Sequence, residues 1–191
     1  MLPPPASLER ICKGLAVLDA IRCEDWEFRL FSFNAAWDAA RGERMASMRN
    51  GEGDAWFIVF TGDHALFKAY WHEHARVDPD AVYAGLPAEL EPQRAEPAFS
   101  MSDVTVGGWY DPARGWTLRG HIEPFAEELA ILTGATDVVR AYTASYFEVD
   151  VPADAIEHLL AGAPLDASTV ARIADGRSIE SLRGDLDEIG Y

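Results

Sequence analysis

The spacing of apolar residues along the chain predicts an N-terminal helix followed by strands. Near the N-terminus, five apolar residues recur at the spacing of one helical face: Leu8, Ile11, Leu15, Leu18 and Ile21. We expect this helix to begin with Ser7 as its N-cap and to pack on a sheet. From Trp26 to Asn34 the pattern changes to the alternation that is typical of a strand.

Further β-prone runs predict a sheet built as an antiparallel meander. Strands are expected at residues 44–49, 55–60, 65–71, 101–110 and 116–119. The connections Asn50–Asp54 and Thr61–His64 are short turns with glycine, which tolerates positive φ. Connections of this length join antiparallel strands, because a parallel pair needs a crossover of about a dozen residues.

The rest of the chain divides into two regions that differ in sequence pattern. Residues 74–99 hold four prolines among several acidic residues and predict an irregular excursion, either a flap over the sheet or a mobile insert. Beyond Gly120 the pattern is helical, with Pro124, Thr136 and Asp166 suited to helix starts and a further edge strand at residues 145–152. We therefore expect one α+β domain over 1–191, mainly sheet with an N-terminal helix in 1–120 and mainly helical in 121–191.

The net negative charge is the most distinctive feature of the overall composition. The 191 residues include 32 acidic and 16 basic side chains, a net charge of −16. Such a surface repels nucleic acid and anionic membranes and favours a basic protein partner. There is no apolar run of about 18 residues and no signal peptide pattern at the N-terminus, so a cytoplasmic protein is expected. Cys12 and Cys23 are expected to be reduced, because a helix would hold them too far apart for a disulfide.

The densest group of reactive side chains lies between Arg44 and His74. Successive strands of a meander alternate in direction, so the turn after residue 49 and the segment after residue 71 should share one end of the sheet. Glu52, Asp54 and His72 are therefore candidates for acid/base catalysis, and Arg49 and Asn50 for binding. The alternative is a turn whose Asn and glycine residues only satisfy backbone geometry.

The run His72-Glu73-His74 also suggests metal binding. On an extended segment, His-x-His places both imidazoles on one side, an arrangement found among metal ligands. A zinc site needs three or four ligands, however, and the other histidines have no motif spacing, so a solvated strand end is the alternative. No nucleotide-binding glycine motif or nucleophile motif is present, and no cofactor is expected.

Aromatic residues are frequent on the predicted strands, where most are expected to be core. Trp37 and Trp71 are the two that we expect to be exposed and available for binding a ligand or partner.

The segment Ser47–Asp54, followed by Trp56–Phe60, resembles a group of uncharacterised bacterial proteins with an MRNGxGD–FIxF pattern. Lys68, His72 and Glu73 match further positions of that pattern. The resemblance implies kinship and carries no assigned activity.

Three functions remain open at this point, the third being an acidic structural module of a larger assembly. The first is a protein-binding module whose acidic surface meets a basic partner, by analogy with small acidic bacterial immunity or regulatory proteins. The second is a metal-dependent or acid/base hydrolase that uses the Glu52/Asp54 turn with His72 and His74. The second predicts that these side chains converge in space.

Overall fold

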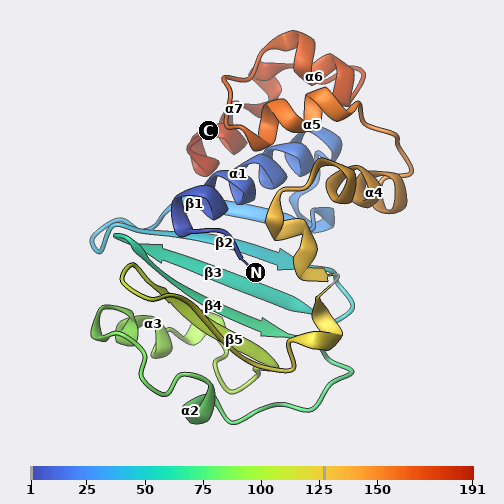
Figure 1. Ribbon diagram of the computed structural model, residues 1–191. Helices are drawn as coiled ribbons and strands as arrows, with labels where there is room; N and C mark the ends of the chain where they lie inside the picture. Colours follow the sequence, from blue (N-terminus) through green and yellow to red (C-terminus); the bar gives the residue numbers. More distant parts are fainter. Residues whose placement is uncertain (1, 127) are drawn as a thin grey trace.

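The structure is a computed structural model that describes residues 2–126 and 128–191 (Figure 1). The strands are β1 Phe31–Asp38, β2 Glu43–Arg49, β3 Ala55–Thr61, β4 His64–Tyr70, β5 Val106–Asp111 and β6 Gly115–Gly120. The α-helices are α1 Pro5–Arg22, α2 Pro79–Val82, α3 Glu91–Arg94, α4 Thr136–Tyr146, α5 Ala153–Leu160, α6 Ala167–Ile173 and α7 Ile179–Ile189. Short 3₁₀ turns are η1 Trp26–Phe28, η2 Ala88–Leu90, η3 Pro97–Phe99, η4 Glu123–Phe125 and η5 Glu128–Thr133. Within the described ranges, no helix is both long and apolar enough to cross a membrane.

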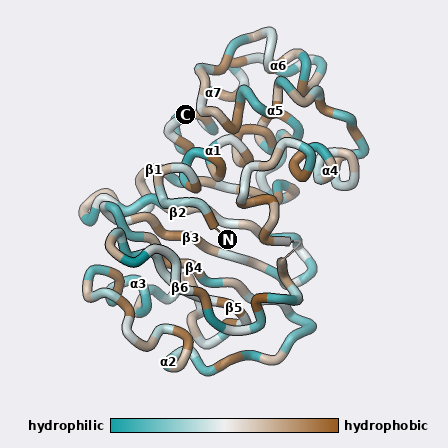
Figure 2. Tube along the Cα trace, viewed as in Figure 1, coloured by the Kyte–Doolittle hydropathy of each residue, from teal (hydrophilic) through white to brown (hydrophobic). Residues whose placement is uncertain are grey.

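The six strands form one antiparallel sheet in the order β1-β2-β3-β4-β5-β6. Each strand therefore pairs with its neighbour in the sequence, and the predicted α+β meander is confirmed. Figure 2 shows that hydrophobic residues are frequent along β3 and β4 in the middle of the sheet. Residues 56–60 of β3 are buried on both faces, as a continuous apolar run predicts.

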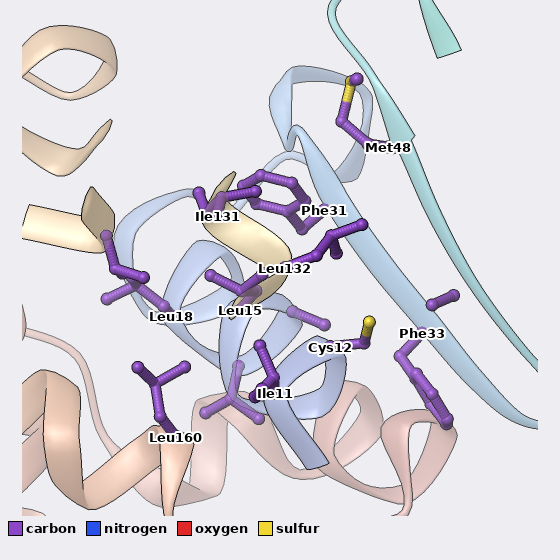
Figure 3. Close-up of a cluster of buried hydrophobic side chains, with 14 of the residues drawn as sticks. Ile11, Cys12, Leu15, Leu18, Phe31, Phe33, Met48, Ile131, Leu132 and Leu160 are labelled. Atoms are coloured by element: carbon purple, nitrogen blue, oxygen red, sulfur yellow. The ribbon is translucent and has the colours of Figure 1, made fainter. Parts of the chain in front are cut away.

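One face of the sheet, the helix face, packs against α1. Phe31, Met48 and Trp56 lie side by side across the first three strands on this face. Figure 3 shows Leu15 and Leu18 of α1 in the same apolar cluster. The α1 helix lies between the sheet and the layer of α5 to α7 (Figure 1). A Cβ at Gly14 would come 2.8 Å from the carbonyl oxygen of Leu159, so glycine is what permits the close approach of α1 and α5.

The opposite face is covered by the proline-rich excursion. Val82, Tyr83, Leu90 and Phe99 are buried against strand side chains of this second face. The Tyr83 hydroxyl donates a hydrogen bond of 2.9 Å to the carbonyl oxygen of Phe67. The structure therefore agrees with the first interpretation of residues 74–99, a flap over the sheet.

Several element boundaries differ from the sequence predictions. The predicted strand from Trp26 begins only at Phe31, because Trp26–Phe28 forms a 3₁₀ turn on the surface, with Trp26 57% exposed. It then continues to Asp38, through part of a predicted loop. The strand predicted from Met101 begins at Val106, because the residues before it still belong to the covering segment.

Helix starts show the same kind of difference. The N-cap of α1 is Pro4 rather than Ser7, since proline suits the first helical turn. Thr136 is the first residue of α4 and not its cap. Asp166 does cap α6, accepting from the backbone N–H of Thr169. No strand forms at residues 145–152, where Glu148 has a φ of 55°. Both cysteines are free thiols, as expected.

Candidate functional site

Two of the predicted catalytic residues meet at one end of the sheet. The 50–54 turn joins β2 to β3, and Tyr70 at the end of β4 pairs with Ala55 at the start of β3. Across this end, His72 Nδ1 and Asp54 Oδ1 are 2.8 Å apart. The backbone N–H of His72 donates to the same oxygen at 2.9 Å. The alternating direction of the strands therefore brings Asp54 and His72 into direct contact.

The turn itself is fixed by Asn50. Its side-chain oxygen accepts the backbone N–H groups of Glu52 and Asp54 at 2.9 and 3.1 Å, and its Nδ2 donates to Asp54 Oδ2 at 2.8 Å. Gly51 and Gly53 have φ values of 75° and 114°, which only glycine adopts without strain. The Asp54 carboxylate is thus held by donors on both oxygens.

These contacts shift the pKa of both partners. Partial burial alone would raise the pKa of Asp54, but the hydrogen bonds from His72 and Asn50 outweigh it and the pKa is lowered. The pKa of His72 is raised, chiefly by its hydrogen bond to Asp54 and also by the charges of Asp54, Glu73 and Glu52. The pair therefore favours a carboxylate facing an imidazolium at mildly acidic pH.

A hollow of about 510 Å³ opens beside this pair, between the end of the sheet and the helical layer. We call it the sheet-end hollow. Its lining residues are Leu30, Phe31, Met48, Asn50, Asp54, Trp56, Trp71, Ile131, Val138, Tyr142 and Ser145. Figure 3 shows Ile131 beside the ring of Phe31, with Met48 on the next strand. The walls are therefore mostly aromatic and aliphatic, and Asp54 and Asn50 supply polar groups at one side.

Asp19 of α1 positions the part of the sheet-end hollow that is lined by Leu30, Phe31 and Tyr142. One of its carboxylate oxygens accepts the backbone N–H groups of Leu30 and Phe31, both at 2.8 Å. The other accepts the hydroxyl of Tyr142 at 2.7 Å. All three of these partners line the sheet-end hollow. Asp19 is fully buried, and this burial raises its pKa to about 7 against the effect of its hydrogen bonds.

The remaining acid/base and metal candidates do not join the pair. Glu52 is exposed in the turn. The segment after β4 turns instead of remaining extended, and His74 packs edge-on against Phe125, with ring centroids 4.6 Å apart. Within residues 2–126 and 128–191, no three His, Cys, Asp or Glu side chains are grouped so that they could hold a metal ion. The extended segment that the metal-binding hypothesis assumed is therefore not present.

The predicted binding residues divide between the two faces. Asn50 and Trp71 line the hollow. Trp71 is only 5% exposed and stacks on Phe125, so the expectation that it is exposed is wrong. Trp37 is half-buried and stacks on Phe99 of the covering segment. Arg49 lies on the second face, with its guanidinium over the ring of Phe57.

Two residues of the hollow were not anticipated as site residues. Asp19 is a charged residue four positions after Leu15 on the apolar side of α1, and such an interruption of an apolar face signals a buried polar contact. The contact of Tyr142 has no signal in the sequence, because nothing there pairs it with Asp19, 123 residues away.

Comparison with protein-family models, with curated proteins and with solved structures found no match. The kinship suggested by the MRNGxGD–FIxF pattern therefore stays a prediction.

Proposed function

We propose that this protein is a binding module for a basic protein partner, and that the sheet-end hollow receives a basic side chain of that partner. The observation that carries the proposal is the chemistry of the lining. It contains four aromatic side chains and the carboxylate of Asp54, and none of the described residues that line it is a lysine, arginine or histidine. Aromatic faces attract cations, and a carboxylate adds a charged acceptor.

The arrangement of Asp54 leaves room for such a contact. Its Oδ1 accepts twice from His72, whereas its Oδ2 accepts once, from Asn50. A carboxylate oxygen has two lone pairs, so Oδ2 can still accept a hydrogen bond from an ammonium or guanidinium group. The fixed turn means that little order has to be gained on binding.

The overall charge favours the same class of partner. Residues 121–191 contain 14 acidic side chains and four arginines. Two of these arginines are already paired with acidic residues of the same region, Arg140 with Asp150 and Arg172 with Asp154. The remaining acidic excess would steer a basic protein toward this molecule and would repel nucleic acid.

A titration with short arginine- or lysine-containing peptides tests the proposal. Trp56 and Trp71 line the hollow, so entry of a basic side chain should change tryptophan fluorescence. We expect saturable binding that weakens as salt is added, and a loss of about tenfold in affinity for Asp54→Asn.

The matched control is Asp63→Asn, which removes an exposed carboxylate in the turn at the other end of β3. This variant should bind like the unchanged protein. Equal losses for both variants would show that only net charge matters, and the hollow would not be the site.

The His72–Asp54 pair favours a second candidate function, acid/base catalysis. A histidine whose Nδ1 is held by a carboxylate presents Nε2 as a general base, as in hydrolases with a catalytic triad. The side chain of His72 is 45% exposed, so water and substrates can reach it. We would measure the hydrolysis of an activated ester by the unchanged protein and by His72→Gln. Equal rates would exclude this candidate.

A further inference from the structure

Lys68 is a buried cation on the second face of the sheet. It lies in the middle of β4, opposite Phe57 of β3 and Gly107 of β5. The residue is only 3% exposed. Because side chains alternate along a strand, Lys68 points away from the helix face that bears the sheet-end hollow.

Aromatic rings and two further cations surround this lysine. Its Nζ lies 5.7 Å from the ring centroids of both Phe57 and Tyr70. The guanidinium of Arg49 lies 5.1 Å from the same Phe57 ring, and that of Arg76 lies 5.1 Å from the same Tyr70 ring. Arg49, Lys68 and Arg76 therefore form a basic cluster around two rings in a chain whose net charge is −16.

Little negative charge balances the cluster. Arg76 is paired with Asp103 at 2.6 Å. Among the described residues, neither Arg49 nor Lys68 has a carboxylate within 4.0 Å or donates a side-chain hydrogen bond. Within the part of the chain that the structure describes, the fully enclosed side-chain nitrogens that lack a hydrogen-bond partner belong to Arg22 and Arg177. Lys68 Nζ is not one of them and therefore keeps some contact with solvent.

An ammonium that is mostly withdrawn from water and has no protein acceptor is costly to the fold. Burial lowers the pKa of Lys68 to about 8, although the nearby charge of Asp103 acts in the opposite direction. The amine is thus still mostly protonated at neutral pH, and an anion placed beside it would supply the missing acceptor.

We propose that Arg49 and Lys68 form a binding site for a small oxyanion, a carboxylate or a phosphoryl group of a ligand. Both cations lie near the same Phe57 ring, at 5.1 and 5.7 Å from its centre, so an oxyanion that accepts from Lys68 is also attracted by the charge of Arg49. Arg49, expected from the sequence to bind a ligand, takes this role here on the face opposite the sheet-end hollow. The proposal is therefore independent of the one for a basic partner, and either can fail alone.

The test is an NMR titration of backbone amides with inorganic phosphate and, separately, with acetate at neutral pH. We expect saturable shifts at millimolar concentrations, largest around Phe57, Lys68 and Tyr70. Saturation by phosphate alone or by acetate alone would identify which oxyanion the site takes.

Four variants make the test specific. Lys68→Met should weaken binding about tenfold, and Arg49→Gln several-fold. Asp103→Asn, which removes the nearby negative charge, should strengthen it. The chain has one other lysine, Lys13, which bonds to the carbonyl oxygen of Gly190 on the surface. The control Lys13→Met should leave binding unchanged.

Two results would overturn the proposal. One is the absence of saturable shifts with both anions. The other is binding by Lys68→Met that equals that of the unchanged protein, which would place any anion elsewhere.

Discussion

Two buried ionisable side chains lie on opposite sides of the sheet, and their surroundings differ completely. Asp19, beneath the helix face, accepts three hydrogen bonds, from two backbone N–H groups and from the Tyr142 hydroxyl. Lys68, on the second face, donates none among the described residues, and its ammonium lies beside the rings of Phe57 and Tyr70. A buried ionisable group with its hydrogen-bond partners in place is an element of structure, whereas one without them is where a ligand can bind.

The comparison extends to two neighbouring residues of β3. Trp56 points to the helix face and lines the sheet-end hollow, where the charged group is a carboxylate. Phe57 points to the second face and carries Arg49 and Lys68 over its ring. The two-residue period of a strand thus separates a surface suited to cations from one suited to anions.

Removing Asp19 should have the largest effect. Asp19→Ala leaves three donors at the wall of the hollow without their acceptor, and we expect it to lower the free energy of unfolding by about 4 kcal/mol. Chemical denaturation measures this loss. Asp19→Asn is the matched control, because its amide oxygen can face the N–H groups of Leu30 and Phe31 while its NH₂ donates to Tyr142. Its loss should be much smaller.

The pH dependence of the same variants sharpens the result. The pKa of Asp19 is raised from 3.8 to about 7 in the folded protein, so the folded state holds a proton that the unfolded state has lost between these values. This contribution to stability is present at low pH and falls as pH rises toward 7. The unchanged protein should show that slope, and Asp19→Asn should lack it. Identical slopes would mean that Asp19 is ionised throughout.

The sequence predicted the sheet better than the contacts that cross it. The meander and the shared end of Asp54 and His72 follow from short turns and alternating strand direction, which are local properties. The Asp19–Tyr142 contact joins residues 123 positions apart, and no spacing rule reaches that far. The exposure of Trp71 was predicted wrongly because Phe125, which covers it, comes from a distant turn.

The burial of Lys68 could not be predicted for the same reason. On the sequence it is one basic residue in an apolar strand, and the excursion packs on Leu66 and Phe57, the neighbours of Lys68 on the second face. A covering segment with four prolines has no periodicity from which its packing against β4 could be read.

Removing the charge of Lys68 should have a smaller effect of the opposite sign. Lys68→Met keeps an unbranched side chain and removes a mostly buried ammonium that has no protein acceptor, so we expect the free energy of unfolding to rise by about 1 kcal/mol at neutral pH. Because the pKa of Lys68 is lowered from 10.5 to about 8, the unfolded state binds the proton more tightly. The stability of the unchanged protein should therefore rise as pH increases from 8 toward 10.5 and approach that of Lys68→Met.

Denaturation at neutral and at alkaline pH, with and without phosphate, measures both effects. Phosphate should stabilise the unchanged protein more than Lys68→Met, because only the unchanged protein has the ammonium that donates to the bound anion. If Lys68→Met were instead less stable at neutral pH, Lys68 would have a structural partner. The contrast with Asp19 would then fail, because both buried groups would be elements of structure.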